Sequence, residues 1–299
     1  MFFDKKGFNI RWRGCLRPEG RLLAYYKVFG LEEEPFSTSP DPAFFYESAE
    51  HREALLRLEI AIKLKRGASL LLGDVGTGKT TLARKLFHAF DDKNKYNFNM
   101  ILDPGCDSEL EFLSSLMDVF EIKVDNPSLV AYRKALEASL FQKGVNENKT
   151  VILLIDEAQK LGTGSIEVLR TLLNYETNKF KLLQLVLFAQ TEFLPQVQEI
   201  RNFWDRISLK YVINPLSLKE TREIIDFRLR QAGYQKNTPL FTDAAVDIIF
   251  HRTEGCPRRI MMLCHNALES LIIKNRSVVE VDTVRELISE EARIVDARH

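Results

Sequence analysis

Residues Gly73-Asp74-Val75-Gly76-Thr77-Gly78-Lys79-Thr80 separate two segments with different hydrophobic patterns. The apolar run 69–72 before them is typical of a short buried strand, whereas residues 81–87 place apolar side chains three and four positions apart, as a helix does. A glycine-rich loop in this context leaves backbone N–H groups free to surround phosphate oxygens, and the helix N-terminus adds partial positive charge. The stretch therefore predicts a nucleotide-binding loop of the form G-x-x-x-x-G-K-T.

This loop predicts specific contacts with ATP. Lys79 is expected to reach the β- and γ-phosphates, and the Thr80 hydroxyl is expected to bind Mg²⁺. The complete set of expected ATP-binding residues in this segment is Gly73, Asp74, Val75, Gly76, Thr77, Gly78, Lys79, Thr80 and Thr81. We therefore expect ATP as the substrate and Mg²⁺ as its cofactor.

Composition restricts the class of protein. Lys plus Arg equals Asp plus Glu at 42 each, so the chain has no overall basic field, and nucleic-acid binding would need a local patch. The cysteines form no C-x-x-C pair, which favours reduced thiols over a zinc site. No apolar stretch approaches the ~18 residues of a membrane span, and no signal peptide is visible. We expect a cytoplasmic protein.

The chain order predicts an α/β domain followed by a helical one. A helix is expected to start near Ser48, and two more are expected at 108–120 and 128–142. Strands that are apolar throughout are separated by helices, which favours a parallel five-stranded sheet covered on both faces. They are expected at 69–72, 98–102, 151–155, 182–189 and 207–213. After Ser217 only helical patterns remain, at 217–232, 241–252, 257–274 and 281–293.

We place the domains accordingly. Residues 25–215 form the predicted nucleotide-binding domain, and residues 216–299 form the predicted helical lid. Residues 1–24 are treated as an extension. They carry Lys5, Lys6, Arg11, Arg13, Arg17 and Arg21 against Asp4 and Glu19. Two interpretations stay open for this segment, namely a disordered tail and a basic arm that touches nucleic acid or a partner.

A second predicted site follows the strand at 151–155, which ends in Asp156-Glu157. An acid at the C-terminal end of a buried strand beside the strand of the phosphate loop is where such proteins hold Mg²⁺. Asp156 is expected to hold the ion, and Glu157 to orient and polarise the attacking water. At the tip of the strand at 182–189, Gln190 is expected to touch the γ-phosphate or that water; the alternative is an ordinary surface glutamine.

Three arginines are candidates for a role in hydrolysis. Arg201 and Arg206 precede the strand at 207–213, where one of them would reach a neighbouring subunit's nucleotide; the alternative for each is a surface salt bridge. Arg258 lies at the start of a helix, where the helix dipole disfavours a cation, so a contact with phosphate is a reason for its presence. The neighbouring Arg259 is an alternative for that contact.

Taken in order, these features resemble an AAA+ ATPase, and more narrowly the ExeA/GspA-like ATPases, which are similar to TniB/TnsC-type transposition ATPases. The narrower resemblance rests on short motifs in residues 25–290. They are Phe29-Gly30-Leu31, Pro35-Phe36, Pro40-Asp41-Pro42, His51-Arg52-Glu53-Ala54-Leu55, the phosphate loop with Thr81, Asp156-Glu157-Ala158-Gln159, Pro215-Leu216-Ser217 and Gly255-Cys256-Pro257-Arg258-Arg259-Ile260.

The resemblance implies ATP hydrolysis at subunit interfaces of a homo-oligomer, either a ring or a filament. It implies that Arg206 is the arginine finger, which reaches a neighbouring subunit's nucleotide, and that Arg258 is the sensor arginine of the lid, which contacts the phosphates. It also implies that the segment around His51 shapes the adenine pocket.

Longer ExeA-like proteins continue into a membrane span and a peptidoglycan-binding domain, and we expect neither here. Two functions remain open: remodelling of a secretion- or pilus-type complex through an unidentified protein partner, and an ATP-dependent regulator of transposition that assembles on duplex DNA. A third hypothesis, a nucleotide-gated scaffold without turnover, is disfavoured by the intact Asp156-Glu157 pair.

Overall fold

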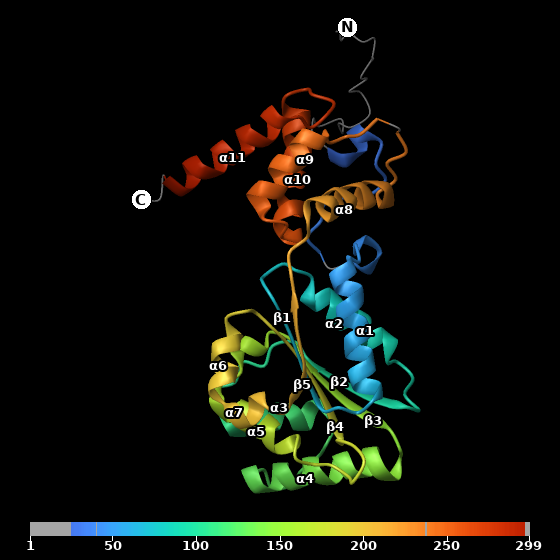
Figure 1. Ribbon diagram of the computed structural model, residues 1–299, viewed down its shortest axis with the longest axis vertical. Helices are drawn as coiled ribbons and strands as arrows, with labels where there is room; N and C mark the ends of the chain where they lie inside the picture. The colour runs from blue at the N-terminus through green and yellow to red at the C-terminus, as the bar shows by residue number, and fades with distance from the viewer. Residues whose placement is uncertain (1–24, 40, 237, 297–299) are drawn as a thin grey trace. The chain divides into compact units, whose positions relative to one another are not determined.

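The computed structural model describes residues 25–39, 41–236 and 238–296, which divide into two compact units (Figure 1). One unit comprises residues 47–214, and the other combines the segment up to Tyr46 with the segment from Pro215 onward. We call them the α/β unit and the helical unit. The predicted extension 1–24 lies outside the described residues.

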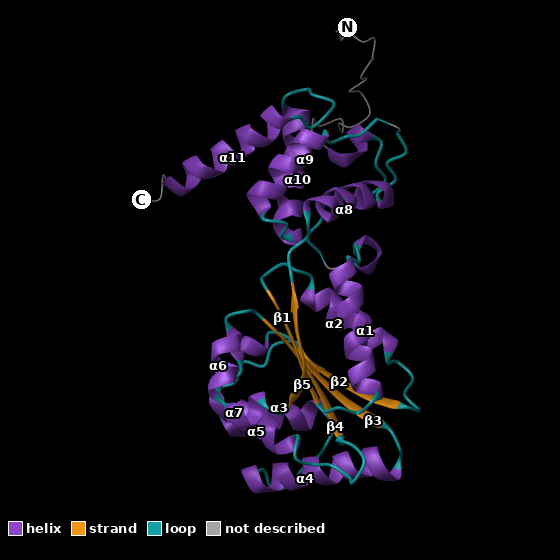
Figure 2. Ribbon diagram, viewed as in Figure 1, coloured by secondary structure: helices purple, strands orange, loops and turns teal. Residues whose placement is uncertain are grey.

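The α/β unit is built on a five-stranded parallel sheet with the order β2-β3-β4-β1-β5. Its strands are β1 (Ala68–Gly73), β2 (Tyr96–Ile101), β3 (Thr150–Ile155), β4 (Leu183–Ala189) and β5 (Ile207–Ile213). Among the described residues, Figure 2 shows strands in this unit alone. The parallel five-stranded sheet predicted from the sequence is therefore confirmed.

Helices cover both faces of this sheet. They are α1 (Ala49–Lys63), α2 (Lys79–Ala89), α3 (Glu109–Val119), α4 (Leu129–Phe141), α5 (Thr163–Leu172), α6 (Phe193–Glu199) and the single turn α7 (Arg201–Trp204). Helices α1 and α2 lie on one face, and α3, α5, α6 and α7 lie on the other (Figure 1). Because side chains alternate along a strand, a strand between two helical layers is buried on both faces and is largely apolar. Every residue of β1 and β4 is buried.

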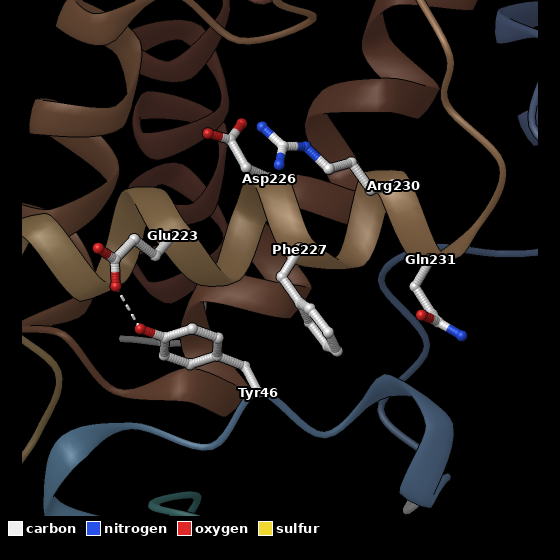
Figure 3. A pocket seen from close by; sticks show the side chains of 6 residues that line it. All are labelled: Tyr46, Glu223, Asp226, Phe227, Arg230 and Gln231. Atoms are coloured by element: carbon white, nitrogen blue, oxygen red, sulfur yellow. Dashed lines mark hydrogen bonds between the residues drawn. The ribbon is translucent and has the colours of Figure 1, made fainter.

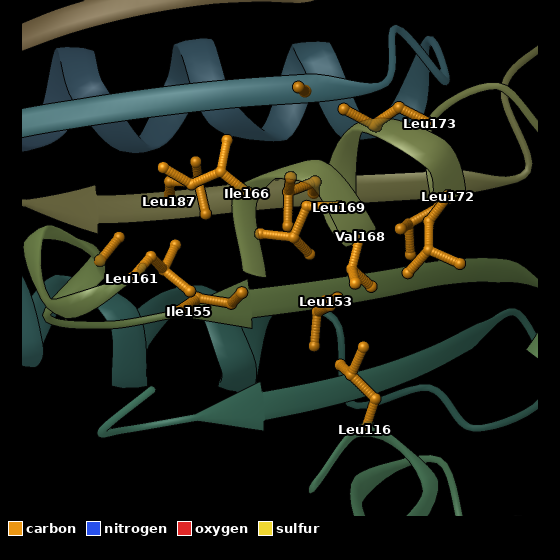
Figure 4. Close-up of a cluster of buried hydrophobic side chains, with 14 of the residues drawn as sticks. Leu116, Leu153, Ile155, Leu161, Ile166, Val168, Leu169, Leu172, Leu173 and Leu187 are labelled. Atoms are coloured by element: carbon orange, nitrogen blue, oxygen red, sulfur yellow. The ribbon is translucent and has the colours of Figure 1, made fainter. Parts of the chain in front are cut away.

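The main core of the α/β unit lies between the sheet and α5 (Figure 4). Leu153 and Leu187 point from the sheet toward the α5 side chains Ile166 and Leu169, and all four are fully buried. Burial of one such leucine contributes roughly 1.5–3 kcal/mol. This packing fixes β3 and β4 side by side and so positions the residues at their ends.

The helical unit contains α8 (Leu218–Gln231), α9 (Asp243–Thr253), α10 (Pro257–Ile273) and α11 (Val281–Asp296). Ser217 begins α8 with a capping box, in which its hydroxyl accepts from the Glu220 N–H while the Glu220 carboxylate accepts from the Ser217 N–H. The Thr242 hydroxyl caps α9 by accepting from the Ala245 N–H, and Pro257 occupies the first turn of α10. The helical region predicted after the sheet is therefore present.

The segment 25–46 packs in the helical unit rather than with the sheet, to which the sequence assigned it. Phe36 is 1% exposed and packs edge-on against Phe241 at a centroid distance of 5.7 Å. The half-buried Arg228 guanidinium donates to the carbonyls of Pro35 (3.2 Å) and Ser37 (2.9 Å). These contacts join residues far apart in sequence, so local pattern does not indicate them. No described helix of either unit combines the length and apolarity required to cross a bilayer.

Gly255 allows a close backbone approach within the helical unit. Its φ is +70°, and an added Cβ would lie 1.9 Å from the Leu216 carbonyl oxygen. The Leu216 N–H in turn donates to the Gly255 carbonyl at 2.9 Å. A side chain at this position would therefore be strained and would also force the two segments apart.

We expect Gly255→Ala to lower the free energy of unfolding by roughly 3 kcal/mol or more, because backbone atoms must move. Gly162→Ala is the matched control, since Gly162 has nothing within 4 Å of the added methyl group. Its change should stay within about 1 kcal/mol, the cost of replacing the N-cap glycine of α5 by alanine. Denaturant unfolding of the full chain measures both. Equal midpoints for the two variants would contradict this account of Gly255.

Candidate active site at the carboxyl edge of the sheet

The predicted site residues follow the carboxyl ends of three strands. The phosphate loop follows β1, Asp156 and Glu157 follow β3, and Gln190 follows β4. The parallel strands bring all three ends to one edge of the sheet. The strand order differs in one respect from the expectation, because β3 is not beside β1: β4 lies between them. Gln190 is thereby placed between the two halves of the site.

The phosphate loop is shaped by glycines and by a threonine. Gly76 and Gly78 have φ values of 86° and 94°, which residues with a Cβ atom rarely adopt. The Thr77 hydroxyl donates to the Asp74 carbonyl at 2.8 Å and closes the turn. An added Cβ on Gly73 would meet that hydroxyl at 2.8 Å. Gly78 then begins α2, whose first N–H groups face the loop.

Lys79 lies inside the loop and is 6% exposed. Its ammonium donates to the carbonyls of Gly73 (2.7 Å) and Asp74 (2.9 Å). The carbonyls of the loop therefore hold a positive charge inside it. This arrangement suits a multiply charged phosphate.

The Thr80 hydroxyl donates to Asp156 Oδ2 at 2.7 Å and joins the loop to β3. The other oxygen, Oδ1, accepts from the Glu157 N–H at 2.9 Å. Asp156 is 2% exposed, and burial raises the pKa of its carboxyl, although the hydrogen bond from Thr80 acts in the opposite direction. Mg²⁺ prefers oxygen ligands, and the Thr80 hydroxyl and the Asp156 carboxylate provide them side by side, so the residues fit the expected ion.

Glu157 and Gln190 are also brought together. Glu157 has a φ of 51°, in the left-handed region, at the start of the short 3-10 turn Ala158–Lys160. Its carboxylate Oε2 lies 3.5 Å from Gln190 Nε2, at the limit of a hydrogen bond. The unusual backbone conformation turns the side chain back toward the tip of β4. Such conformations in non-glycine residues occur often at functional sites.

Two polar side chains at this edge were not among the predicted site residues. Gln159 donates from Nε2 to Glu157 Oε2 at 2.6 Å, and its Oε1 accepts from the Gln190 N–H at 3.1 Å. Thr191 donates from its hydroxyl to Asp74 Oδ1 at 2.6 Å. The signal in the sequence was their closeness to residues already chosen, since Gln159 is two positions after Glu157 and Thr191 follows Gln190.

His51 contacts the phosphate loop from α1. Its Nε2 lies 2.8 Å from the Thr77 carbonyl, and its Nδ1 lies 2.8 Å from the Ser48 hydroxyl. Since a carbonyl only accepts, Nε2 carries the proton, and in a neutral ring Nδ1 accepts from Ser48. The Ser48 oxygen also accepts from the His51 N–H and caps α1. The sequence pointed to His51 only through the resemblance, and its contact with the loop went unforeseen.

Arg206 lies at the opposite edge of the sheet. Ile207 begins β5 level with Ala68, whereas Ile213 pairs with Gly73 at the phosphate loop. Six residues of strand separate these two levels by roughly 20 Å, which is further than an arginine side chain reaches. Arg206 instead donates to the Asn202 carbonyl at 3.1 Å and to Asn174 Oδ1. It therefore cannot contact a phosphate bound in its own loop.

The other candidate arginines are exposed. Arg201 lies on α7. Arg258 lies in the first turn of α10 and has no hydrogen bond or ion pair with any residue that the structure describes. Arg259 beside it forms a 3.4 Å ion pair with Glu254.

The helical unit has a cavity of about 420 Å³ between Tyr46 and one side of α8 (Figure 3). Tyr46 donates to Glu223 Oε2 at 2.5 Å, and its ring lies 6.0 Å from that of Phe227. Burial raises the pKa of Asp226, the second carboxyl of this cavity. The cavity thus combines aromatic and acidic groups.

Comparisons with known proteins agree with this geometry. Residues 62–197 match a family described as an AAA domain. Over 246 residues, or 82% of this chain, the sequence is 35% identical to general secretion pathway protein A of Aeromonas hydrophila. The chain spans 44% of the length of that protein. It is also 23% identical over 211 residues to origin recognition complex subunit 1 of Cricetulus griseus, of which it covers 24%.

Solved structures with the same fold share less sequence. The Cdc6p protein of Pyrobaculum aerophilum matches with a TM-score of 0.62 and 18% identity over 86% of this chain and 70% of that one. The RuvB Holliday junction branch migration motor of Thermotoga maritima matches with a TM-score of 0.55 and 18% identity over 83% and 72%, respectively. Residues 62–197 therefore form an AAA domain, and the chain shares the fold of these AAA+ proteins and is related to general secretion pathway protein A.

Proposed function

We propose that this protein binds ATP with Mg²⁺ in the phosphate loop and hydrolyses it at an interface between two copies of the chain. The observation that carries the proposal is the 2.7 Å hydrogen bond between Thr80 and Asp156, with the buried Lys79 beside it. Lys79 supplies a positive charge at the N-terminus of α2, and the oxygens of Thr80 and Asp156 beside it are suitable metal ligands. The match of residues 62–197, which include all three, to an AAA domain supports this proposal.

Each side chain has a distinct task in this proposal. The loop N–H groups and Lys79 bind and orient the phosphates, while Thr80 and Asp156 hold Mg²⁺, which neutralises phosphate charge when it is bound. Glu157 accepts the proton of the attacking water through its carboxylate. Gln190 and Thr81 complete the phosphate-facing side of the loop. Arg258 of the helical unit is proposed to contact the phosphates as well.

Hydrolysis also needs positive charge opposite the loop, and Arg206 is proposed to supply it to a second copy. Its position at the far edge of the sheet supports this role, because the phosphate loop of its own chain is out of reach. Arginines supplied in this way raise kcat by about 10³–10⁵. The protein is therefore proposed to act as a ring or filament whose assembly controls turnover.

The relationship to general secretion pathway protein A favours a role in assembling or remodelling a secretion- or pilus-type complex. The second candidate is ATP-dependent assembly on duplex DNA, as in transposition regulators. It is favoured by the fold shared with the Aeropyrum pernix ORC1 protein, solved in complex with DNA, at a TM-score of 0.60 and 20% identity. The basic residues of 1–24 would supply its phosphate contacts.

Glu157→Gln should retain ATP binding and lose hydrolysis, with kcat reduced about 10²-fold or more, because the proton acceptor is removed while the loop is unchanged. Lys79→Ala should lose ATP binding. Glu199→Gln is the control, since it makes the same chemical change at an exposed position on α6. Nucleotide titration and phosphate release measure the two properties separately. Hydrolysis at the wild-type rate by Glu157→Gln would refute the role of Glu157.

Mixing two inactive variants tests whether the site is shared between copies. Arg206→Ala keeps its loop, and Lys79→Ala keeps its arginine, so each should be inactive alone and their mixture should regain activity. Wild-type specific activity should also rise with protein concentration. Arg201→Ala, tested in parallel, should hydrolyse ATP without being mixed with another variant. A mixture as inactive as its components would contradict the shared site.

The same assay with duplex DNA separates the two candidate functions. If the DNA-dependent function is correct, duplex should raise hydrolysis, and binding of the duplex should weaken as salt increases. A rate indifferent to DNA at low salt would exclude that function and leave the protein-remodelling role.

A further inference from the structure

Both the oxygen and the nitrogen of the Gln159 side-chain amide form hydrogen bonds. Its Oε1 accepts from the backbone N–H of Gln190 at 3.1 Å, and its Nε2 donates to Glu157 Oε2 at 2.6 Å. A backbone N–H can only donate and a carboxylate can only accept, so the amide has one orientation that satisfies both contacts. The side chain is therefore a fixed bridge between the tip of β4 and the carboxylate of Glu157.

The bridge leaves the two oxygens of Glu157 unequal. Oε2 takes the short contact from Gln159 and the long contact from Gln190 Nε2 at 3.5 Å. Oε1 has no hydrogen-bond partner among the described residues. Because one oxygen is anchored and the other is free, the carboxylate has a defined direction in which to accept a proton. Orientation of this kind matters, since a displacement of about 1 Å can cost about 10² in rate.

The bridge also belongs to a closed path of contacts across the three strand ends. Thr191, the residue after Gln190, donates to Asp74 of the phosphate loop at 2.6 Å. From the loop, Thr80 returns to Asp156, next to Glu157 in sequence, at 2.7 Å. A change in the loop is thus connected to the orientation of Glu157 from two sides. Hydrogen bonds arranged in such networks reinforce one another.

We propose that Gln159 is a positioning residue that holds the carboxylate of Glu157 for proton transfer and ties it to the tip of β4. This inference rests on the proposed ATP hydrolysis at the same site. Gln159 itself does not contact the reacting atoms. Its effect passes through Glu157, so it should alter kcat and leave the binding of ATP unchanged.

The test compares Gln159→Ala and Gln159→Glu with the wild type in the full chain. Gln159→Ala removes both contacts, whereas Gln159→Glu keeps the shape and the acceptor for the Gln190 N–H but replaces the donor facing Glu157 with an oxygen. Both should lower kcat roughly tenfold or more while KM and the ATP Kd change less than about twofold. Gln196→Ala is the control, because its amide donates to the Leu161 carbonyl at 3.0 Å, away from Glu157. Its kcat should match the wild type.

A double variant distinguishes positioning from a general structural effect. In the background of Glu157→Gln, Gln159→Ala should change the residual rate by less than about twofold, because the group it positions is already lost. A full additional tenfold loss there, or a rise in KM with a lower thermal midpoint, would overturn the proposal. So would wild-type kcat in Gln159→Glu.

The failure of this inference differs from that of the proposed function. If the wild type hydrolyses ATP and Glu157→Gln does not, yet Gln159→Ala equals the wild type, the inference alone is wrong. If the wild type shows no hydrolysis at any protein concentration, the proposed function is wrong, and the inference fails with it.

Discussion

The hydrogen bond between Thr80 and Asp156 joins the start of α2, which follows β1, to the end of β3, and the rest of the site depends on it. It forms only because the sheet is parallel, so that β1 and β3 end at the same edge with β4 between them. The central strands β1, β3 and β4 are largely apolar and buried, and the polar side chains of the site follow the residues where these strands end. The same burial that stabilises the sheet thus confines the chemistry to one edge.

At that edge the polar groups hold one another as well as any ligand. Asp74, Thr191, Gln190, Gln159 and Glu157 form one path, and Thr80 with Asp156 forms a second path back to the loop. Each bond alone contributes on the order of 1 kcal/mol, yet the buried carboxylate of Asp156 would be costly without its donors. The arrangement therefore favours a site that is organised before a nucleotide arrives. Organised donors and acceptors need little rearrangement during reaction.

The sequence predicted the strands well because a fully buried parallel strand has a strong local signal. Helix starts were equally clear where Ser48, Ser217 or Pro257 marked them. Helix α5 was not anticipated: Gly162 and Gly164 stand at its start and weaken the pattern, and its stability comes from packing on β3 and β4. The contact of Arg228 with residues 35–37 and the bridge of Gln159 were also missed. Both depend on segments that meet only in the folded chain, and spacing along the sequence carries no trace of them.

The position of Arg206 links this edge to a second molecule. All groups proposed to hold the phosphates from the α/β unit lie at the carboxyl edge, while this arginine lies at the amino edge, roughly 20 Å away along β5. One copy of the unit therefore has a place for nucleotide and an arginine that cannot serve it. Joining the carboxyl edge of one copy to the amino edge of the next would be a heterologous contact, and repeating it produces a ring or an open filament. Under this arrangement binding of ATP needs one chain and efficient hydrolysis needs two, so the rate of ATP hydrolysis depends on how many copies have assembled. This dependence is what a protein that remodels a larger complex requires, because ATP is then consumed only where copies have gathered.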